Sequence, residues 1–121
     1  MDKKDILKKI EESGLDKNRI IVLSGASLVV QGIIKSTHDI DLSCDMEYYK
    51  TLNWNIKIGA LGKEIKYFDV FEISYNLFDL KNVILINNIK FMPVDKCMEL
   101  KQKLGRKKDK KLLEKYQNIC K

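Results

Sequence analysis

Two aspartates separated by a single residue are the feature of this sequence best suited to chemistry. Asp39 and Asp41 open a stretch, residues 39–44, in which polar and apolar residues alternate strictly, a pattern typical of a half-buried strand. Alternate residues of a strand share a face, so the two carboxylates should project side by side. Adjacent like charges raise each other's pKa unless a cation lies between them, and carboxylate oxygens suit Mg²⁺. The pair therefore predicts a magnesium site; the alternative is an exposed strand end that happens to carry acids.

A run of small residues earlier in the chain is a candidate anion site. Gly25, Ala26 and Ser27 separate the apolar, β-branched run 20–23, predicted to be a buried strand, from the apolar segment 28–34, predicted to be a short helix. Small residues let backbone N–H groups approach a phosphate, the helix dipole favours its charge, and Ser27 offers a hydroxyl. The alternative is an ordinary turn with a serine cap.

The order of these features resembles a known signature. Gly25, Ala26 and Ser27, then eleven residues, then the pair Asp39 and Asp41, are similar to the motif of DNA polymerase β-like nucleotidyltransferases. The resemblance is closest to small bacterial members of the abortive-infection and toxin–antitoxin type. It is tight over residues 20–44 and looser to the end of the chain. Ala26 departs from it, because many relatives have a second glycine there.

This resemblance implies a fold and an activity. The fold is α/β (α+β): a short mixed β-sheet flanked by helices, two of them C-terminal, with the site at one edge of the sheet. The activity is transfer of a nucleoside monophosphate from an NTP to an acceptor hydroxyl, with release of pyrophosphate. Asp39 and Asp41 would hold two Mg²⁺ ions, or Mn²⁺, and residues 25–27 would bind the β- and γ-phosphates. The acceptor stays open among an RNA end, a protein side chain and a small molecule.

The family generally adds a third carboxylate from a neighbouring strand, and two residues compete for that role. Asp69 and Glu72 have opposite parity, so only one of them can face the aspartate pair. Apolar residues lie on both faces of segment 67–74, so periodicity does not choose between them. The resemblance favours Glu72 as metal ligand and catalytic residue.

Two charged residues interrupt the apolar stripes of the expected C-terminal helices. Lys101 lies in the stripe of a helix predicted over 93–104, and Asp109 continues the stripe of a final helix, 106–119. A charge in such a position must be paired or face a wet site. The family's Lys and Arg-x-Lys-Asp segment implies that Lys101 meets the triphosphate and that Arg106 or Asp109 orients it. The alternatives are a Lys101–Asp109 ion pair, or a Lys101 stem lying along the edge of the stripe.

The remaining elements surround these residues. The pattern predicts helices over 2–13 and 46–52, two or three strands within 54–75 with a turn at 61–63, and a hairpin of 83–86 and 89–92 around Asn87 and Asn88. Four residues outside the motif could stack on a base or lie near the metal, but we expect them to have packing or surface roles: His38, Tyr48, Tyr49 and Trp54.

Length and composition narrow the class of protein. With 121 residues, 1–121 form one domain, and a 45% hydrophobic share argues against disorder. The net charge of +6 is compatible with binding nucleotides or RNA, or only with solubility. Three scattered cysteines, no apolar run long enough to span a membrane and no apolar leader indicate a cytoplasmic protein. The rival functions are a non-catalytic antitoxin or regulator that binds a partner protein, and a basic RNA-binding protein.

Overall fold

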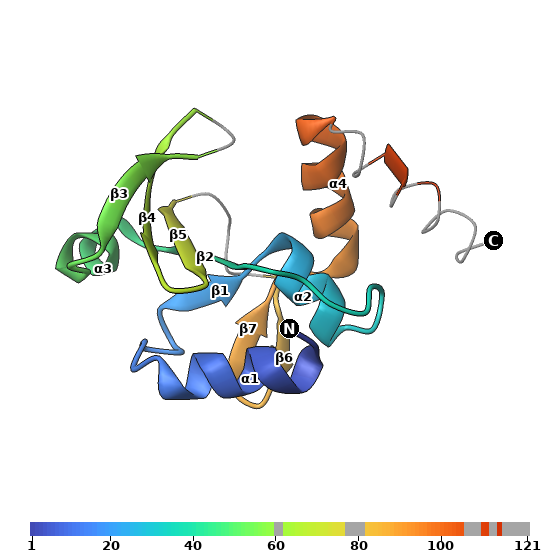
Figure 1. Ribbon diagram of the computed structural model, residues 1–121, viewed down its shortest axis with the longest axis horizontal. Coiled ribbons are helices and arrows are strands. Elements are labelled where there is room, and N and C mark those ends of the chain that lie inside the picture. The colour runs from blue at the N-terminus through green and yellow to red at the C-terminus, as the bar shows by residue number, and fades with distance from the viewer. Residues whose placement is uncertain (60–61, 77–81, 106–109, 112–113, 115–121) are drawn as a thin grey trace.

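Seven strands of the described residues form one mixed β-sheet at the centre of the molecule (Figure 1). The computed structural model describes residues 1–59, 62–76, 82–105, 110–111 and 114. The strands are β1 (Ile20–Val22), β2 (Ile40–Cys44), β3 (Asn55–Ile58), β4 (Glu64–Phe68), β5 (Phe71–Tyr75), β6 (Ile84–Ile86) and β7 (Ile89–Phe91). Their order is β3-β4-β5-β2-β1-β7-β6, with β2 in the middle.

The sheet mixes parallel and antiparallel pairs. β2 is parallel to β5 and antiparallel to β1, and β1 is parallel to β7; the other neighbours are antiparallel. The helices are α1 (Lys3–Glu12), α2 (Ser24–Val30), α3 (Met46–Thr51) and α4 (Val94–Leu104). The expected class, a mixed sheet flanked by helices, is confirmed. The strand that carries Asp41 is central, whereas the resemblance implied a site at one edge of the sheet.

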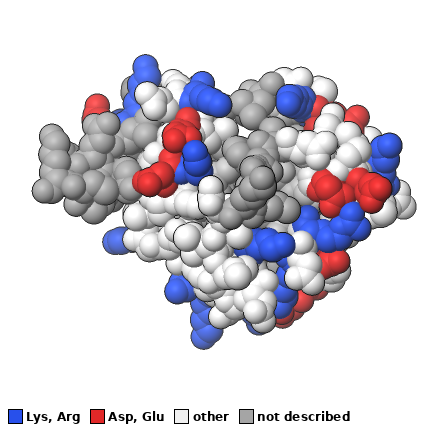
Figure 2. Space-filling model, turned by 180° about the vertical axis from the view of Figure 1, so that it is seen from behind, with Lys and Arg blue, Asp and Glu red and all other residues white. Residues whose placement is uncertain are grey.

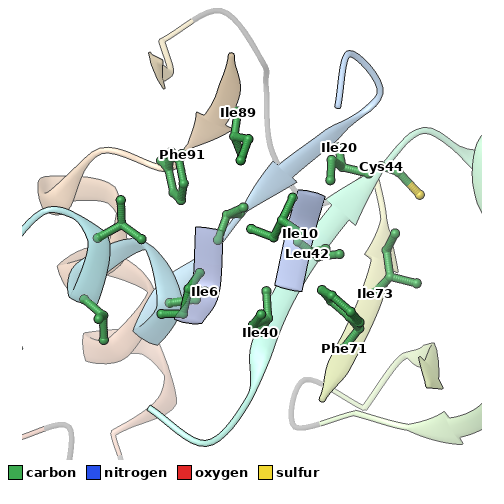
Figure 3. Close-up of a cluster of buried hydrophobic side chains, with 14 of the residues drawn as sticks. Ile6, Ile10, Ile20, Ile40, Leu42, Cys44, Phe71, Ile73, Ile89 and Phe91 are labelled. Carbon is green, nitrogen blue, oxygen red and sulfur yellow. The ribbon is translucent and has the colours of Figure 1, made fainter. Parts of the chain in front are cut away.

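One face of the sheet packs against α1. Ile40 and Leu42 of β2 are buried on this face together with Ile6 and Ile10 of α1, each at most 1% exposed (Figure 3). Complete burial of each such side chain contributes about 1.5–3 kcal/mol to folding. The alternation of β2 then turns Asp41 to the other face, as the sequence pattern predicted.

The second face of β1 packs against α4. Ile21 and Leu23 form a smaller apolar cluster with Cys97 and Met98 of this helix. Since Leu23 N–H donates to the Asp41 carbonyl at 2.8 Å, this cluster adjoins the strand position of Asp41. α4, which packs chiefly against α2, therefore lies on the side of the sheet to which Asp41 points.

Local signals place most element ends where the sequence predicted them. α1 begins at a capping box in which Asp2 and Asp5 each accept the other's backbone N–H, and Gly14 follows its end at φ +75°. Asn87 and Asn88 both adopt positive φ between β6 and β7, as a type I′ hairpin turn requires. The predicted helix at 93–104 is found as α4, with Pro93 as its N-cap.

The start of α2 differs from the prediction. The helix begins at Ser24 and ends at Val30, instead of spanning 28–34, so residues 25–27 are its first turn and not a loop. Ser24 makes the turn with φ +49°, a left-handed value that glycine adopts more easily. The small residues after it permit close packing of the helix, because Ala26 and Ser27 are almost fully buried.

Some expectations fall outside the described residues. The final helix predicted over 106–119 is described only at 110–111 and 114, and Arg106 and Asp109 lie outside. Cys44 and Cys97 are both buried and free, and Cys120 lies outside. Within the described part of the chain, no helix combines the length and apolar character needed to cross a membrane.

Candidate active site

Asp41 and Glu72 lie side by side on neighbouring strands. β2 and β5 run in parallel with Asp41 opposite Glu72, so both side chains project from the same face of the sheet. Both are partly buried. The pKa of Asp41 is raised to about 6, foremost by burial and then by the negative charges of Glu72 and Asp39 and a hydrogen bond with Glu72. Asp41 thus holds a proton more readily than an isolated aspartate does.

Asp39 lies at the rim of the acid cluster that Asp41 and Glu72 form. It precedes β2 and is exposed, yet its charge is close enough to contribute to the raised pKa of Asp41. Across the described residues, no three His, Cys, Asp or Glu side chains converge closely enough to hold a metal ion. The fit to a magnesium site is therefore partial. Asp41 and Glu72 supply adjacent hard oxygen donors whose mutual repulsion a cation would relieve, whereas Asp39 has to turn inward to join them.

Asp69, the rival of Glu72, points elsewhere. It occupies the tight turn between β4 and β5 at φ +54°, and its carboxylate forms an exposed ion pair with Lys9 of α1 at 2.9 Å. That pairing directs Asp69 away from Asp41. Of the two candidates for a third carboxylate, the structure brings only Glu72 to Asp41.

Lys101 lies on the same side of the sheet as Asp41. Its side chain projects from α4 and is buried, at 7% exposure, so the ammonium is not in bulk solvent. Its positive charge lowers the pKa of Asp41, which opposes the effect of burial and places Lys101 within electrostatic reach of that carboxyl. The geometry thus brings Asp41 beside Glu72, with Lys101 within electrostatic reach of Asp41. Arg106 and Asp109, expected to accompany Lys101, lie outside the described residues.

The hydroxyl of Ser27 is engaged inside the protein. Ser27 Oγ donates to the Met92 carbonyl at 2.6 Å and accepts from Gln31 Nε2 at 2.8 Å, and the residue has no exposed surface. These bonds tie α2 to the chain that follows β7. The hydroxyl is therefore not offered to a ligand, in contrast to the role that the sequence suggested. Alternation and spacing could not reveal this, because Met92 is distant in sequence.

Gly25 and Ala26 lie in the first turn of α2. A Cβ atom added to Gly25 would lie 3.0 Å from Thr37 Oγ1, so the absence of a side chain permits close contact between α2 and the segment that leads into β2. The Ala26 side chain is 1% exposed and belongs to the core. What these residues can offer a phosphate is their backbone N–H groups, since the first turn of a helix leaves such groups without intrahelical partners.

Lys57 is a charged residue of the cluster that the sequence did not single out. Its ammonium binds Glu72 Oε1 at 2.5 Å and lies 5.0 Å from the centre of the Tyr67 ring. The hydrogen bond with Glu72, foremost, raises the pKa of Lys57, and the charges of Glu72 and Asp39 act in the same direction. The alternation of residues 55–58 predicts a strand there. It does not predict which strand lies next to β3, and so it could not show that Lys57 reaches Glu72.

The three aromatic residues outside the motif, Tyr48, Tyr49 and Trp54, have contacts within the fold. Tyr49 is buried and donates to Glu64 at 2.8 Å, and Trp54 packs against the rings of Phe68 and Phe71. Tyr48 Oη accepts the Asp16 backbone N–H at 2.8 Å. His38 is exposed.

Charges of both signs lie on one face of the molecule (Figure 2). On the face drawn in Figure 2, basic and acidic side chains of the described residues alternate and do not gather into one basic patch. No family model, curated protein or solved structure matches the chain significantly. The resemblance to nucleotidyltransferases therefore depends on the sequence alone, chiefly on residues 20–44.

Proposed function

We propose that this chain is a magnesium-dependent nucleotidyltransferase of the cytoplasm, which moves a nucleoside monophosphate from an NTP to an acceptor hydroxyl and releases pyrophosphate. The observation that carries the proposal is the pairing of Asp41 with Glu72 on one face of the sheet, where burial, foremost, and the charge of Glu72 raise the pKa of Asp41 to about 6. Such a pair does not stabilise the fold, because burial and the repulsion between the two carboxylates both make the ionised form of Asp41 less favourable. Strongly perturbed acids in this arrangement are typical of functional sites.

The roles of the residues follow from their positions. Asp41 and Glu72, joined by Asp39 from the rim, would hold Mg²⁺. When bound, Mg²⁺ would neutralise the charge that develops on the transferring phosphate. The acceptor oxygen forms a bond to the α-phosphorus as the α–β phosphoanhydride bond breaks, and the hydroxyl proton passes to a carboxylate of the cluster.

Two features near Asp41 suit the triphosphate. Lys101 contributes a buried positive charge on the same side of the sheet. The hydrogen bond from Leu23 N–H to the Asp41 carbonyl keeps the first turn of α2, with Gly25 and Ala26, beside the strand of the acids. Backbone N–H groups and a lysine together favour phosphate oxygens. The acceptor is an RNA end, a protein side chain (for example of a toxin–antitoxin partner) or a small molecule.

Calorimetric titration with each NTP tests the proposal. The parent protein should release or absorb heat with at least one NTP in Mg²⁺ and none in EDTA, and Asp41→Asn should abolish the signal while its circular dichroism stays unchanged. Asp69→Asn is the matched control, because it too replaces one aspartate by its amide, but Asp69 lies in the β4–β5 turn and pairs with Lys9 in the parent. Binding that persists in EDTA, or in Asp41→Asn, would overturn the metal assignment.

A second candidate is a non-catalytic antitoxin or regulator of the same fold. It is favoured by an apolar surface on one side of β3 and β4, where Ile56, Ile58 and Phe68 are 59%, 70% and 58% exposed. Such a surface is typical of protein interfaces. A regulator of this kind should show no magnesium-dependent heat with any NTP, which separates it from the enzyme in the same titration.

A further inference from the structure

Lys57 reaches the acid cluster from the edge of the sheet. Among the described strands, β3 is the outermost on its side and has β4 as its one neighbour, and all four of its residues are exposed. Tyr67 of β4 lies opposite Glu72 of β5. The Lys57 side chain passes over the Tyr67 ring and ends on the Glu72 carboxylate, so it crosses the intervening strand to reach its partner.

The two lysines of the cluster differ in how firmly they are held. Lys101 is buried and belongs to α4, which packs against the sheet. Lys57 is 43% exposed in its side chain and Glu72 is 29% exposed, so water screens their ion pair. Edge strands with few buried contacts also open more readily than central ones. Lys57 is therefore the cation that can leave the cluster without disturbing the core.

We propose that Lys57 is a built-in counter-cation of this site, which occupies Glu72 in the metal-free protein and leaves it when a divalent cation binds. The inference rests on the proposed function, because it takes Asp41 and Glu72 as the cation's ligands. Its chemical basis is competition: an ammonium and a divalent cation seek the same carboxylate oxygens, and the divalent ion gains from Asp41 and Asp39 as well. Lys57 then acts as a positioning residue that sets the concentration of metal at which the site fills.

Titration of the full chain with Mn²⁺ alone measures this competition. Lys57→Met should bind Mn²⁺ about 10-fold more tightly than the parent, whereas Lys57→Arg, which keeps a charge that pairs with Glu72, should stay close to the parent. Lys9→Met is the matched control. Lys9 also forms a lysine–carboxylate pair with 43% of its side chain exposed, but its partner is Asp69, so its removal should leave Mn²⁺ affinity unchanged.

A second measurement tests whether the metal ion displaces the Lys57 ammonium from Glu72, or whether removing a positive charge merely raises metal affinity in general. In ¹⁵N-labelled protein, the ammonium signal of Lys57 should be visible in the metal-free state, because its bond with Glu72 slows exchange with water, and it should disappear as Mg²⁺ saturates. The ammonium of Lys66, held by the carbonyls of Tyr49 and Leu52, should persist throughout and serves as internal reference.

The outcomes are distinct. If Lys57→Met binds Mn²⁺ no more tightly than the parent while Asp41→Asn abolishes binding, the metal site stands and the role of Lys57 is overturned. A Lys57 ammonium signal that is absent without metal, or that survives saturating Mg²⁺, overturns that role too. If Mn²⁺ binds to neither the parent nor Lys57→Met, or binds equally to Asp41→Asn, the proposed function fails and this inference fails with it.

Discussion

Asp41 on β2 and Glu72 on β5 face each other in a parallel register, thirty-one positions apart in the chain. Parallel pairing puts their carboxyl groups on one face of the sheet, and partial burial keeps water from screening them. Holding the two acids together therefore lowers the free energy of unfolding when Asp41 is ionised. This relationship leads to predictions about stability as well as about activity.

Asp41→Asn should stabilise the protein at neutral pH. The pKa of Asp41 is raised from 3.8 to about 6 in the folded state, so the folded protein binds more protons than the unfolded chain between these values. Stability then falls as pH rises from 3.8 to about 6 and stays lower above it. Removing the charge should recover about 1–3 kcal/mol at pH 7.5 and almost nothing near pH 4. Urea unfolding at both pH values checks this. An Asn variant that is less stable than the parent at pH 7.5 would contradict the raised pKa.

Glu72→Gln should lower nucleotidyl transfer by about 100-fold or more, because a neutral amide neither neutralises a cation nor accepts a proton. Asp69→Asn should leave the rate within a factor of about two, since Asp69 lies in an exposed pair with Lys9 and exposed pairs contribute little. Initial rates at saturating NTP compare the two variants. Equal losses in both would remove the distinction between them, and a larger loss in Asp69→Asn would reverse it.

Lys101→Met should weaken nucleotide affinity by about 10-fold while the protein stays folded, because the apolar stem is conserved and only the charge is lost. The pKa of Asp41 should rise further, since the charge of Lys101 lowers it in the parent. Calorimetry with NTP in Mg²⁺, beside a thermal melt, separates two roles. If Tm drops and affinity is unchanged, Lys101 serves the fold and not the triphosphate.

Ser27→Ala should destabilise the protein by about 1–2 kcal/mol, the cost of losing the hydrogen bonds of a buried hydroxyl. The lost bonds are those to the Met92 carbonyl and from Gln31. Nucleotide affinity should not change, because the hydroxyl faces the interior. Thermal unfolding and NTP titration of the same sample test both statements. A variant with unchanged Tm and lost affinity would restore Ser27 as a phosphate ligand.

The sequence predicted what depends on local pattern. Strict alternation over 39–44 placed Ile40 and Leu42 in the core and turned Asp41 away from it, and the Asn87-Asn88 turn followed from the ability of asparagine to adopt positive φ. Apolar periodicity also found α4 and its buried lysine.

Features that depend on contacts between segments distant in the chain could not be predicted from the sequence. The neighbour of β2 is β5, and only this pairing brings Glu72 to Asp41. The turn that carries Asp69 to Lys9, and the strand order that lets Lys57 reach Glu72, are also products of the whole sheet. The start of α2 was predicted too late because small residues suit a loop as well as a closely packed first turn.

The most direct measurement follows the α- and the γ-phosphate of the NTP separately. The protein is incubated in Mg²⁺ with NTP labelled at either the α- or the γ-phosphate, with cellular RNA and protein offered as acceptors. The α-label should become attached to an acceptor, the γ-label should appear in pyrophosphate, and Asp41→Asn should show neither. Attachment of the γ-label, equal transfer by Asp41→Asn, or no transfer with any of the four NTPs would contradict nucleotidyl transfer at Asp41 and Glu72.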